Sequence, residues 1–302
     1  MHHAGELAAL LTACFWTVTA LSFEAASKRI GSMSVNLLRL VVGFLFLSLF
    51  TWIYRGAFFP VDATASAWFY LILSGLVGFV FGDLCLFQAF VVIGARVSML
   101  MMALAPPITA LIGWIILGEH LTPMNWLGMA ITIAGIALVV LRREEKDVTS
   151  RAIRKVKFNF PIWGVLLGLG GALGQAAGLV LSKYGMKDYD PFAASQIRVL
   201  TGIAGFSILF TILGRWKNAL QSLSLRKPMI QLSVGAFFGP FLGVSFSLLS
   251  VQLTTAGIAA TIMAIVPVLI IAPSVIINKE KVTFREIAGA IIAVGGVSLF
   301  FI

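Results

Sequence analysis

The stretch between Lys227 and Lys279 holds 51 consecutive residues without an aspartate, glutamate, lysine, arginine or histidine. A helix needs about 20 predominantly apolar residues to cross a bilayer, so this stretch is too long for one spanning helix. The polar cluster Gln252, Thr254 and Thr255 divides it into two predicted spans. Of the 302 residues 60% are hydrophobic and 11% are charged, against about 25% charged in soluble domains. The composition excludes a soluble enzyme and indicates a polytopic membrane protein.

Ten apolar segments of this kind follow one another along the chain, at about residues 5–26, 33–54, 66–90, 95–117, 123–141, 161–183, 191–213, 228–252, 255–277 and 283–301. The loops between them are short, except for the charged residues 142–160 in the middle of the chain. We therefore predict an all-α membrane protein of ten transmembrane helices. Residues 1–141 and 161–302 form its two five-helix repeats, and 142–160 is a charged linker between them.

An internal repeat supports this division into halves. A shift of 161 residues aligns residues 78–139 with 239–300 without a gap, and it pairs Pro106 with Pro267. Upstream, a shift of 159 residues pairs polar and charged residues, Asn36 with Ser195 and Arg39 with Arg198. Because each half contains an odd number of predicted spans, the second half must cross the membrane in the opposite orientation. Inverted repeats are typical of secondary transporters, whose substrate site lies near the midplane between the halves.

Basic residues are distributed unequally between alternate loops. The loops after the first, third, fifth, seventh and ninth spans carry 17 of the 22 lysines and arginines, and the opposite loops carry Arg55, Lys183 and Lys187. Cytoplasmic loops carry the excess of basic residues, so we expect the 142–160 linker to be cytoplasmic and both termini to lie outside. The net charge of +10 then reflects orientation and contact with anionic headgroups. Nucleic-acid binding is not expected, because the sequence has no basic helix or stacking-aromatic module.

Two segments resemble a known family. Residues 82–122 read GDLCLFQAFVVIGARVSMLMMALAPPITALIGWIILGEHLT, and residues 243–283 repeat this pattern more loosely. Both are similar to the third and fourth helices of the drug/metabolite transporter superfamily, EamA-domain branch. Phe15-Trp16 and the LLR sequence at residues 37–39 are similar to its first and second helices. One departure from the family pattern is Val244, which stands where the first copy has Asp83.

The resemblance implies a secondary transporter of the bacterial inner membrane. Such a protein moves a small metabolite, such as an amino acid or a related compound, and often exports it. Transport would occur by alternating access, with the two halves rocking around a central cavity. We expect this cavity to be walled by spans 1–4 and 6–9, with spans 5 and 10 at the edge of each half.

Ionisable side chains inside the spans are candidates for function, because each costs about 2.5–3.5 kcal/mol at the centre of a spanning helix. Asp83 is expected to bind a proton in the transport cycle or a cationic group of the substrate; structural pairing with Arg39 is the alternative. Arg39 and Arg198 are expected to form gating ion pairs or to attract carboxylated substrates, and snorkelling toward headgroups is the alternative. Glu24 and Lys183 correspond at the shift of 159. Glu24 is also spaced for an ordinary i,i+4 pair with Lys28.

Further candidates are polar, aromatic or proline residues near these charges. Asn36 shares a helix face with Arg39, and Gln88 follows Asp83 by five residues. Prolines at matched positions of both halves interrupt the fourth and ninth spans, as is common at transporter binding sites, and a packing kink without substrate contact is the alternative. The predicted substrate-binding or gating residues are Trp16, Glu24, Asn36, Arg39, Asp83, Gln88, Pro106, Trp114, Gln175, Lys183, Arg198 and Pro267.

No enzymatic activity, cofactor or metal is predicted. Cys14 and Cys85 lie in apolar runs, and His120 is the one histidine away from the N-terminus. The sequence therefore lacks metal-ligand spacing. A lipid flippase, a non-transporting assembly subunit and an intramembrane lipid-modifying enzyme remain as alternatives. The enzyme would need clustered carboxylates or histidines, whereas Glu24 and Asp83 are isolated.

Overall fold

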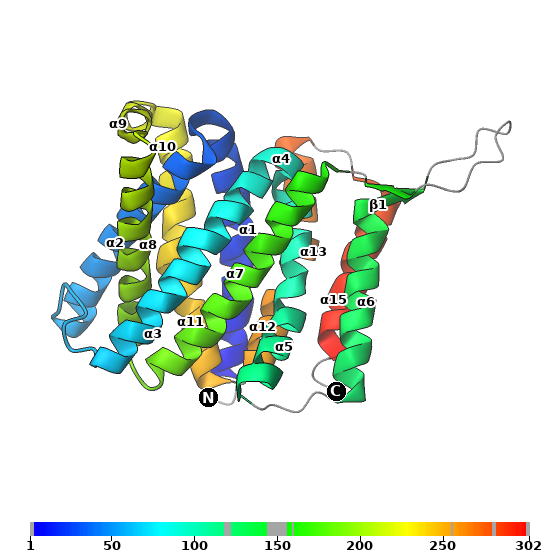
Figure 1. Cartoon of the computed structure of the whole chain (residues 1–302), viewed down its shortest axis with the longest axis horizontal. Coiled ribbons are helices and arrows are strands. Elements are labelled where there is room, and N and C mark those ends of the chain that lie inside the picture. The colour runs from blue at the N-terminus through cyan, green and yellow to red at the C-terminus, as the bar shows by residue number, and fades with distance from the viewer. Residues whose placement is uncertain are drawn as a thin grey trace, which may run out of the picture.

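The computed structural model describes residues 3–117, 122–143, 156–158, 160–254, 256–279 and 282–299, which are almost entirely helical (Figure 1). The helices of the first half are α1 (Ala4–Ile30), α2 (Ser32–Arg55), α3 (Ala65–Gly75), the π-helix η1 (Leu76–Gly82), α4 (Asp83–Met101), the 3₁₀-helix η2 (Met102–Leu104), α5 (Ala105–Leu117) and α6 (Pro123–Val140). The helices of the second half are α7 (Ile162–Met186), α8 (Pro191–Ile212), α9 (Trp216–Leu223), α10 (Arg226–Ala236), the π-helix η3 (Phe237–Gly243), α11 (Val244–Leu253), α12 (Ala256–Met263), α13 (Val266–Leu269), α14 (Ile271–Asn278) and α15 (Phe284–Ser298).

A two-stranded hairpin joins the halves. Strands β1 (Leu141–Arg143) and β2 (Val156–Phe158) pair antiparallel at the two ends of the predicted linker, with Leu141 opposite Phe158. Residues 144–155 of the linker lie outside the described residues. In Figure 1 the hairpin lies at the upper edge of the molecule, while α1 begins at the lower edge.

The described helices make the chain an integral, multi-pass membrane protein. Six segments are each long and apolar enough to cross a membrane: Ala4–Ile30, Ser32–Arg55, Ala65–Ile112, Ile162–Met186, Pro191–Ile212 and Arg226–Leu253. Trp126–Val139 and Val266–Ile277 are shorter apolar helical segments. The ninth predicted span is broken into α12, α13 and α14, and prolines lie in the first turns of the last two, where a missing backbone N–H is tolerated. The count of ten crossings therefore stays a prediction.

The segment Ala65–Ile112 covers one predicted span and most of the next. The backbone leaves the helical conformation at Gly94, with φ 79° and ψ 159°, which glycine adopts without steric cost. In Figure 1 the chain ascends through α3 and α4 and descends through α5. The reversal at Gly94 lies between the predicted spans 66–90 and 95–117.

The two π-helices lie at equivalent positions of the repeat. η1 (Leu76–Gly82) and η3 (Phe237–Gly243) are separated at both ends by 161 residues, the shift that aligns the two sequences. A π-helical turn contains an extra residue and is frequent at functional sites. The sequence repeat is thus matched by a repeated irregularity of the backbone.

The first helix of each half packs on the third helix of the other half. α1 contacts α10, η3 and α11, and α7 contacts α3, η1 and α4. Glycines make the second contact close: a Cβ atom added at Gly174 would lie 2.4 Å from the Cα of Gly82, and one at Gly178 would lie 3.1 Å from the Cα of Gly78. Figure 1 shows that α1 and α7 begin at opposite edges, so the two halves are inverted and interlocked.

The fifth helices of the two halves, α6 and α15, pack against each other at one side of the molecule (Figure 1). Gly135 approaches the carbonyl oxygen of Gly289, and Gly296 approaches that of Gly128. The shift of 161 residues relates Gly128 to Gly289 and Gly135 to Gly296, so this contact is nearly symmetric. In Figure 1 the α6–α15 pair lies to one side of the other described helices, which occupy the centre of the molecule.

Candidate functional site

A cavity of about 120 Å³ lies at the centre of the molecule. Its walls come from α1, α2, η1, α4, η2, α5, α7, α8, η3, α11, α12, α13 and residue Ala264. No described residue of α6 or α15 lines it. The expectation that spans 1–4 and 6–9 enclose a cavity is therefore confirmed for the described helices. Most lining side chains are apolar, with aromatic rings and methionines such as Phe90, Met99 and Met263.

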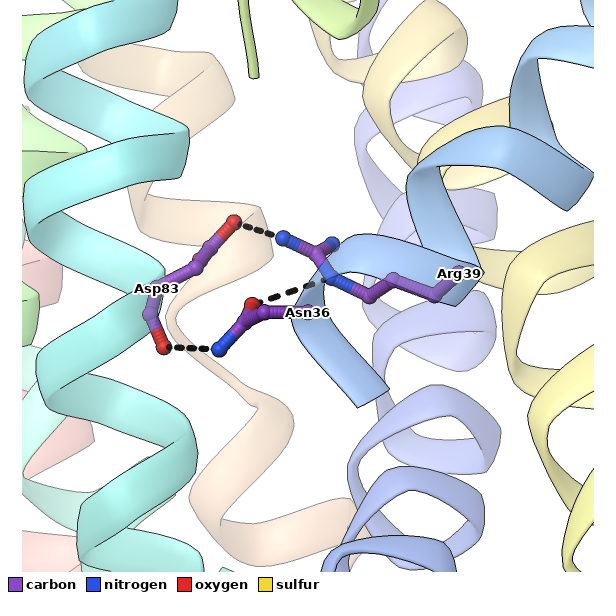
Figure 2. A network of polar contacts seen from close by, with 3 residues as sticks. All are labelled: Asn36, Arg39 and Asp83. Atoms are coloured by element: carbon purple, nitrogen blue, oxygen red, sulfur yellow. Dashed lines mark hydrogen bonds and ion pairs between the residues drawn. The ribbon is translucent and has the colours of Figure 1, made fainter. Parts of the chain in front are cut away.

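An ion pair between Arg39 and Asp83 lies in the cavity wall (Figure 2). The Nη2 of Arg39 on α2 donates to the Oδ2 of Asp83, the first residue of α4. Asn36 joins the pair on its α2 side: its Oδ1 accepts from Arg39 Nε at 3.2 Å, and its Nδ2 donates to the backbone carbonyl of Asp83 at 3.2 Å. All three residues are at least 92% buried. The network satisfies a carboxylate and a guanidinium that would otherwise be costly in a membrane interior.

Three phenylalanines surround the guanidinium of Arg39. Its Cζ lies 4.5 Å from the ring centroid of Phe87 and 5.6 Å from the centroids of Phe23 and Phe79. Aromatic faces attract cations at these distances, by about 0.5–2 kcal/mol for each contact. The rings also fix the position of Arg39, so that its ion pair with Asp83 is held from several sides.

Arg198, the equivalent of Arg39 in the second half, also lines the cavity but has different surroundings. It projects from α8, is 4% exposed, and its Cζ lies 4.8 Å from the ring centroid of Phe79. Asp83 attracts Arg198 electrostatically, but its ion-pair contact is with Arg39. Among the described residues, no side chain or backbone group accepts a hydrogen bond from the buried Nε of Arg198. A charged donor is therefore left in the cavity wall.

Four other predicted site residues line the same cavity. Trp16 on α1 and Gln175 on α7 are equivalent at the shift of 159 and face it from the two first helices. Pro106 on α5 and Pro267 on α13 are equivalent at the shift of 161 and face it from the fourth helix of each half. With Arg39, Asp83 and Arg198, seven of the predicted residues meet at one cavity.

The remaining predicted residues are placed elsewhere. Glu24 is buried on α1 and forms the i,i+4 ion pair with Lys28, at 2.6 Å. Gln88 on α4 accepts a hydrogen bond from Ser32 at 2.6 Å, and neither residue lines the cavity. Lys183 is exposed near the end of α7. Trp114 lies in α5, and its side chain falls outside the described part of the structure.

The aromatic residues around the arginines were not singled out from the sequence. Phe79 contacts both guanidinium groups, and it precedes Asp83 by four residues. The spacing of four residues, which places Phe79 and Asp83 on the same helix face, was the sequence signal available for Phe79. It does not stand out among 24 phenylalanines in a chain that must present apolar side chains to lipid.

Polar contacts within and between the two halves lie at the lower edge of the molecule. Arg55 at the end of α2 forms an ion pair with Asp62 at 2.5 Å, and the hydroxyl of Tyr189, between α7 and α8, donates to Asp62 at 2.9 Å. Burial, together with the hydrogen bond to Asp62, raises the pKa of Tyr189 to about 12. Partial burial would raise the pKa of Asp62, but the Tyr189 hydroxyl, the local backbone and Arg55 together lower it. Gln252 of α11 donates to the carbonyl oxygens of Lys187 and Tyr189.

An ion pair between the halves lies near the opposite edge. Arg96, two residues after the bend at Gly94, contacts Glu286 in the first turn of α15 at 3.0 Å. Glu286 also completes a capping box with Thr283 at the start of that helix. The two edges of the molecule are thus each bridged between halves by charged groups.

Comparison with known proteins identifies a curated relative and similar solved structures. The chain is 24% identical over 198 residues to an uncharacterized membrane protein of Saccharomyces cerevisiae; the match covers 62% of this chain and 47% of that protein. The chain thus spans about half the length of this curated relative. A solved crystal structure matches with a TM-score of 0.65 and 17% sequence identity, covering 99% of this chain and 96% of the other, which supports the fold alone.

A family model describes nearly the whole chain. The model of the EamA-like transporter family matches twice, at residues 3–141 and at residues 162–302. The two matches correspond to the two inverted halves that surround the cavity. The chain belongs to the EamA-like transporter family of the drug/metabolite transporter superfamily.

Proposed function

We propose that the protein is a secondary transporter that exports a small metabolite, such as an amino acid or a related compound. The observation that carries this proposal is the central cavity, which is lined by both inverted halves and by three charged side chains of the described residues. Membership in a transporter family supports the same conclusion. The resemblance to bacterial members favours the inner membrane, with the linker in the cytoplasm near anionic headgroups and the termini outside.

Transport would proceed by rocking of one half against the other. The cross-half contacts at opposite edges are suitable gates, because opening one edge requires only the contacts at that edge to break. Tyr189 and Asp62 would close the lower edge, and Arg96 and Glu286 the upper edge. The π-helices and the helix breaks near Pro106 and Pro267 border the cavity, and they offer positions at which helices can bend.

Asp83 is the proposed coupling residue. Its carboxylate lines the cavity and is bound to Arg39, so protonation of Asp83 would remove the ion pair that joins α2 to α4. The binding of a proton would thereby change the contacts between two helices of the cavity wall. Val244 occupies the equivalent position in the second half, so this coupling would occur once in each cycle.

Export from proteoliposomes tests the proposal. Vesicles containing the protein would be loaded with a defined mixture of amino acids, short carboxylic acids and small amines, and efflux would be followed by mass spectrometry. We expect at least one component to leave faster than from protein-free vesicles. Asp83→Asn should slow that efflux about tenfold or more and remove its dependence on a pH gradient.

A matched surface variant controls for the chemical change. Asp188→Asn makes the same substitution at an exposed carboxylate outside the cavity, and efflux should be unchanged. If no component leaves faster than from empty vesicles, the transporter proposal is wrong for these classes of compound. If Asp83→Asn retains both the rate and the pH dependence, the coupling role of Asp83 is wrong.

A further inference from the structure

The repeat relates two arginines and two partner positions. Arg39 and Arg198 are equivalent at the shift of 159, and Asp83 and Val244 are equivalent at the shift of 161. Asp83 and Val244 each begin the helix that follows a π-helix, and both line the cavity. In the first half the arginine is paired with the carboxylate. In the second half the position that would supply the carboxylate holds an apolar side chain.

Arg198 is consequently a buried cation without a hydrogen-bonded counterion in the described structure. A guanidinium group stays protonated in proteins, so Arg198 cannot reduce the cost of burial by losing its charge. Among the described residues its Nε has no hydrogen-bond acceptor, and Asp83 forms its ion pair with Arg39. Of the described residues that line the cavity, the charged ones are two arginines and one aspartate, which together give a formal charge of +1. A ligand with one negative charge would neutralise the cavity.

We propose that Arg198 binds the carboxylate of a small monoanionic substrate whose apolar body packs against the aromatic and methionine side chains of the cavity. This inference rests on the proposed transport function and names the class of its substrate. A guanidinium group binds a carboxylate through charge-assisted, often bidentate hydrogen bonds. The substrate carboxylate then takes the role in the second half that Asp83 has in the first.

The same arrangement disfavours positively charged groups. A protonated primary amine in the cavity would need a carboxylate as its partner, but Asp83 already accepts a hydrogen bond from Arg39. An amine would also add a second unbalanced positive charge beside Arg198. The expected order of affinity is therefore the carboxylic acid first, its neutral amide next, and the corresponding amine last. A zwitterionic amino acid should bind less tightly than the same molecule without its amino group.

Calorimetric titration of the full chain in phosphatidylcholine nanodiscs tests this order. The probes are 3-phenylpropionate, 4-methylpentanoate and indole-3-acetate, each compared with its own amide; 3-phenylpropylamine and phenylalanine extend the phenyl series. We expect at least one carboxylate to bind about ten- to hundredfold more tightly than its amide, as is typical for a charge-assisted hydrogen bond. If none of the three carboxylates binds more tightly than its amide, or if the amine binds best, the inference is overturned.

Two substitutions at Val244 separate charge from packing. Val244→Asp supplies the missing carboxylate and should pair with Arg198, so the affinity for the carboxylate probe should fall about tenfold or more. Val244→Asn introduces a side chain of nearly the same shape as aspartate but without the charge. The affinity for the carboxylate probe should then change less than about threefold. Equal losses in the two variants would contradict the inference, because the effect would then come from packing.

Substitution of the arginine gives an independent measurement. Arg198→Gln should remove the preference for the carboxylate over the amide while retaining amide binding, and retained amide binding also demonstrates a folded cavity. A carboxylate preference that persists in Arg198→Gln overturns the inference. These experiments measure binding, so they can support the proposed substrate class even if the efflux assay shows no transport. Efflux of amines alone would support the transport function and contradict the proposed substrate class.

Discussion

Two arginines at equivalent positions of the repeat differ in what balances their charge. Arg39 has a carboxylate, an asparagine and three aromatic rings, whereas Arg198 has the ring of Phe79 and no hydrogen-bonded carboxylate among the described residues. Removing one partner of a buried ion pair leaves the other charge uncompensated, and this is generally more costly than losing the pair as a whole. The two arginines should therefore respond differently to the same substitution.

Arg39→Gln should destabilise the protein by about 3–5 kcal/mol, because Asp83 would remain buried without its cation. Arg198→Gln should leave stability unchanged or raise it, since it removes a buried charge whose Nε lacks an acceptor among the described residues. Thermal unfolding in detergent, followed by circular dichroism, measures both. In the double variant Arg39→Gln/Asp83→Asn the loss should be smaller than the sum of the two single losses. Additive losses would mean that the two groups do not depend on each other.

Among single residues, the sequence identified the charged residues of the cavity better than the aromatic and polar side chains around them. Arg39, Asp83 and Arg198 could be identified because ionisable groups are rare in apolar spans, and all three meet at the cavity. Phe79 could not be distinguished, because lipid-facing and cavity-facing phenylalanines have the same local sequence character. Gln88, five residues after Asp83, shares its helix face only loosely by spacing, and it accepts a hydrogen bond from Ser32 away from the cavity.

Among the elements, the repeated interruptions of the helices are the main finding beyond the sequence. The repeat predicted equivalent spans, but not that η1 and η3 would both be π-helical. Hydrophobic periodicity does not report a one-residue insertion in a helical turn, because nearly all residues there are apolar. The signal that was present is the pair of glycines in each copy, Gly78 with Gly82 and Gly239 with Gly243. In the first copy these glycines contact α7.

Close packing of α7 on η1 makes Gly174 sensitive to a single methyl group. A Cβ atom there would lie 2.4 Å from the Cα of Gly82, and the contact is with backbone, which cannot rotate away. We expect Gly174→Ala to lower the free energy of unfolding by about 1–3 kcal/mol, as for overpacked interiors. Thermal unfolding in detergent measures the change.

Gly295 provides the matched control for this substitution. It is an exposed position within α15, and a Cβ atom added there meets nothing within 4 Å. Gly295→Ala should therefore stabilise the protein by about 0.4–1 kcal/mol, because alanine restricts the unfolded chain more than glycine does. If both variants lost stability equally, the packing of α7 against η1 would not explain the first result.

The molecule as a whole combines two inverted halves, interlocked by their first helices and bridged at both edges. The odd number of predicted spans in each half already required inversion, and the structure agrees (Figure 1). The exchange of α1 and α7 between halves could not be predicted, because local sequence does not specify which apolar face a spanning helix contacts. The number of crossings was counted from hydropathy alone. Helices interrupted by proline, such as α13, are too short to establish the number of crossings.

The inferred orientation can be measured in cells. A reporter that fluoresces only in the cytoplasm should stay dark when fused after Ile302 and become bright when inserted after Asp147 in the linker. The reason is the excess of basic residues in the loops that share a side with the linker. A bright C-terminal fusion together with a dark linker insertion would reverse the assignment. Equal brightness at both positions would indicate a miscounted span.

The interlocking of the halves also determines when the first half can be completed during synthesis. Domains generally fold as units, starting from the N-terminus while the rest of the chain is still being made. Here the glycine-lined face of η1 is covered by α7, which ends at Met186, and α1 is covered by η3, by α10 to α12 and by α13, which ends at Leu269. The helices of the first half therefore lack part of their helix–helix contacts until most of the second half has been inserted into the bilayer. A ribosome that stops after residue 141 would release a bundle whose glycine face is open to lipid or to another chain.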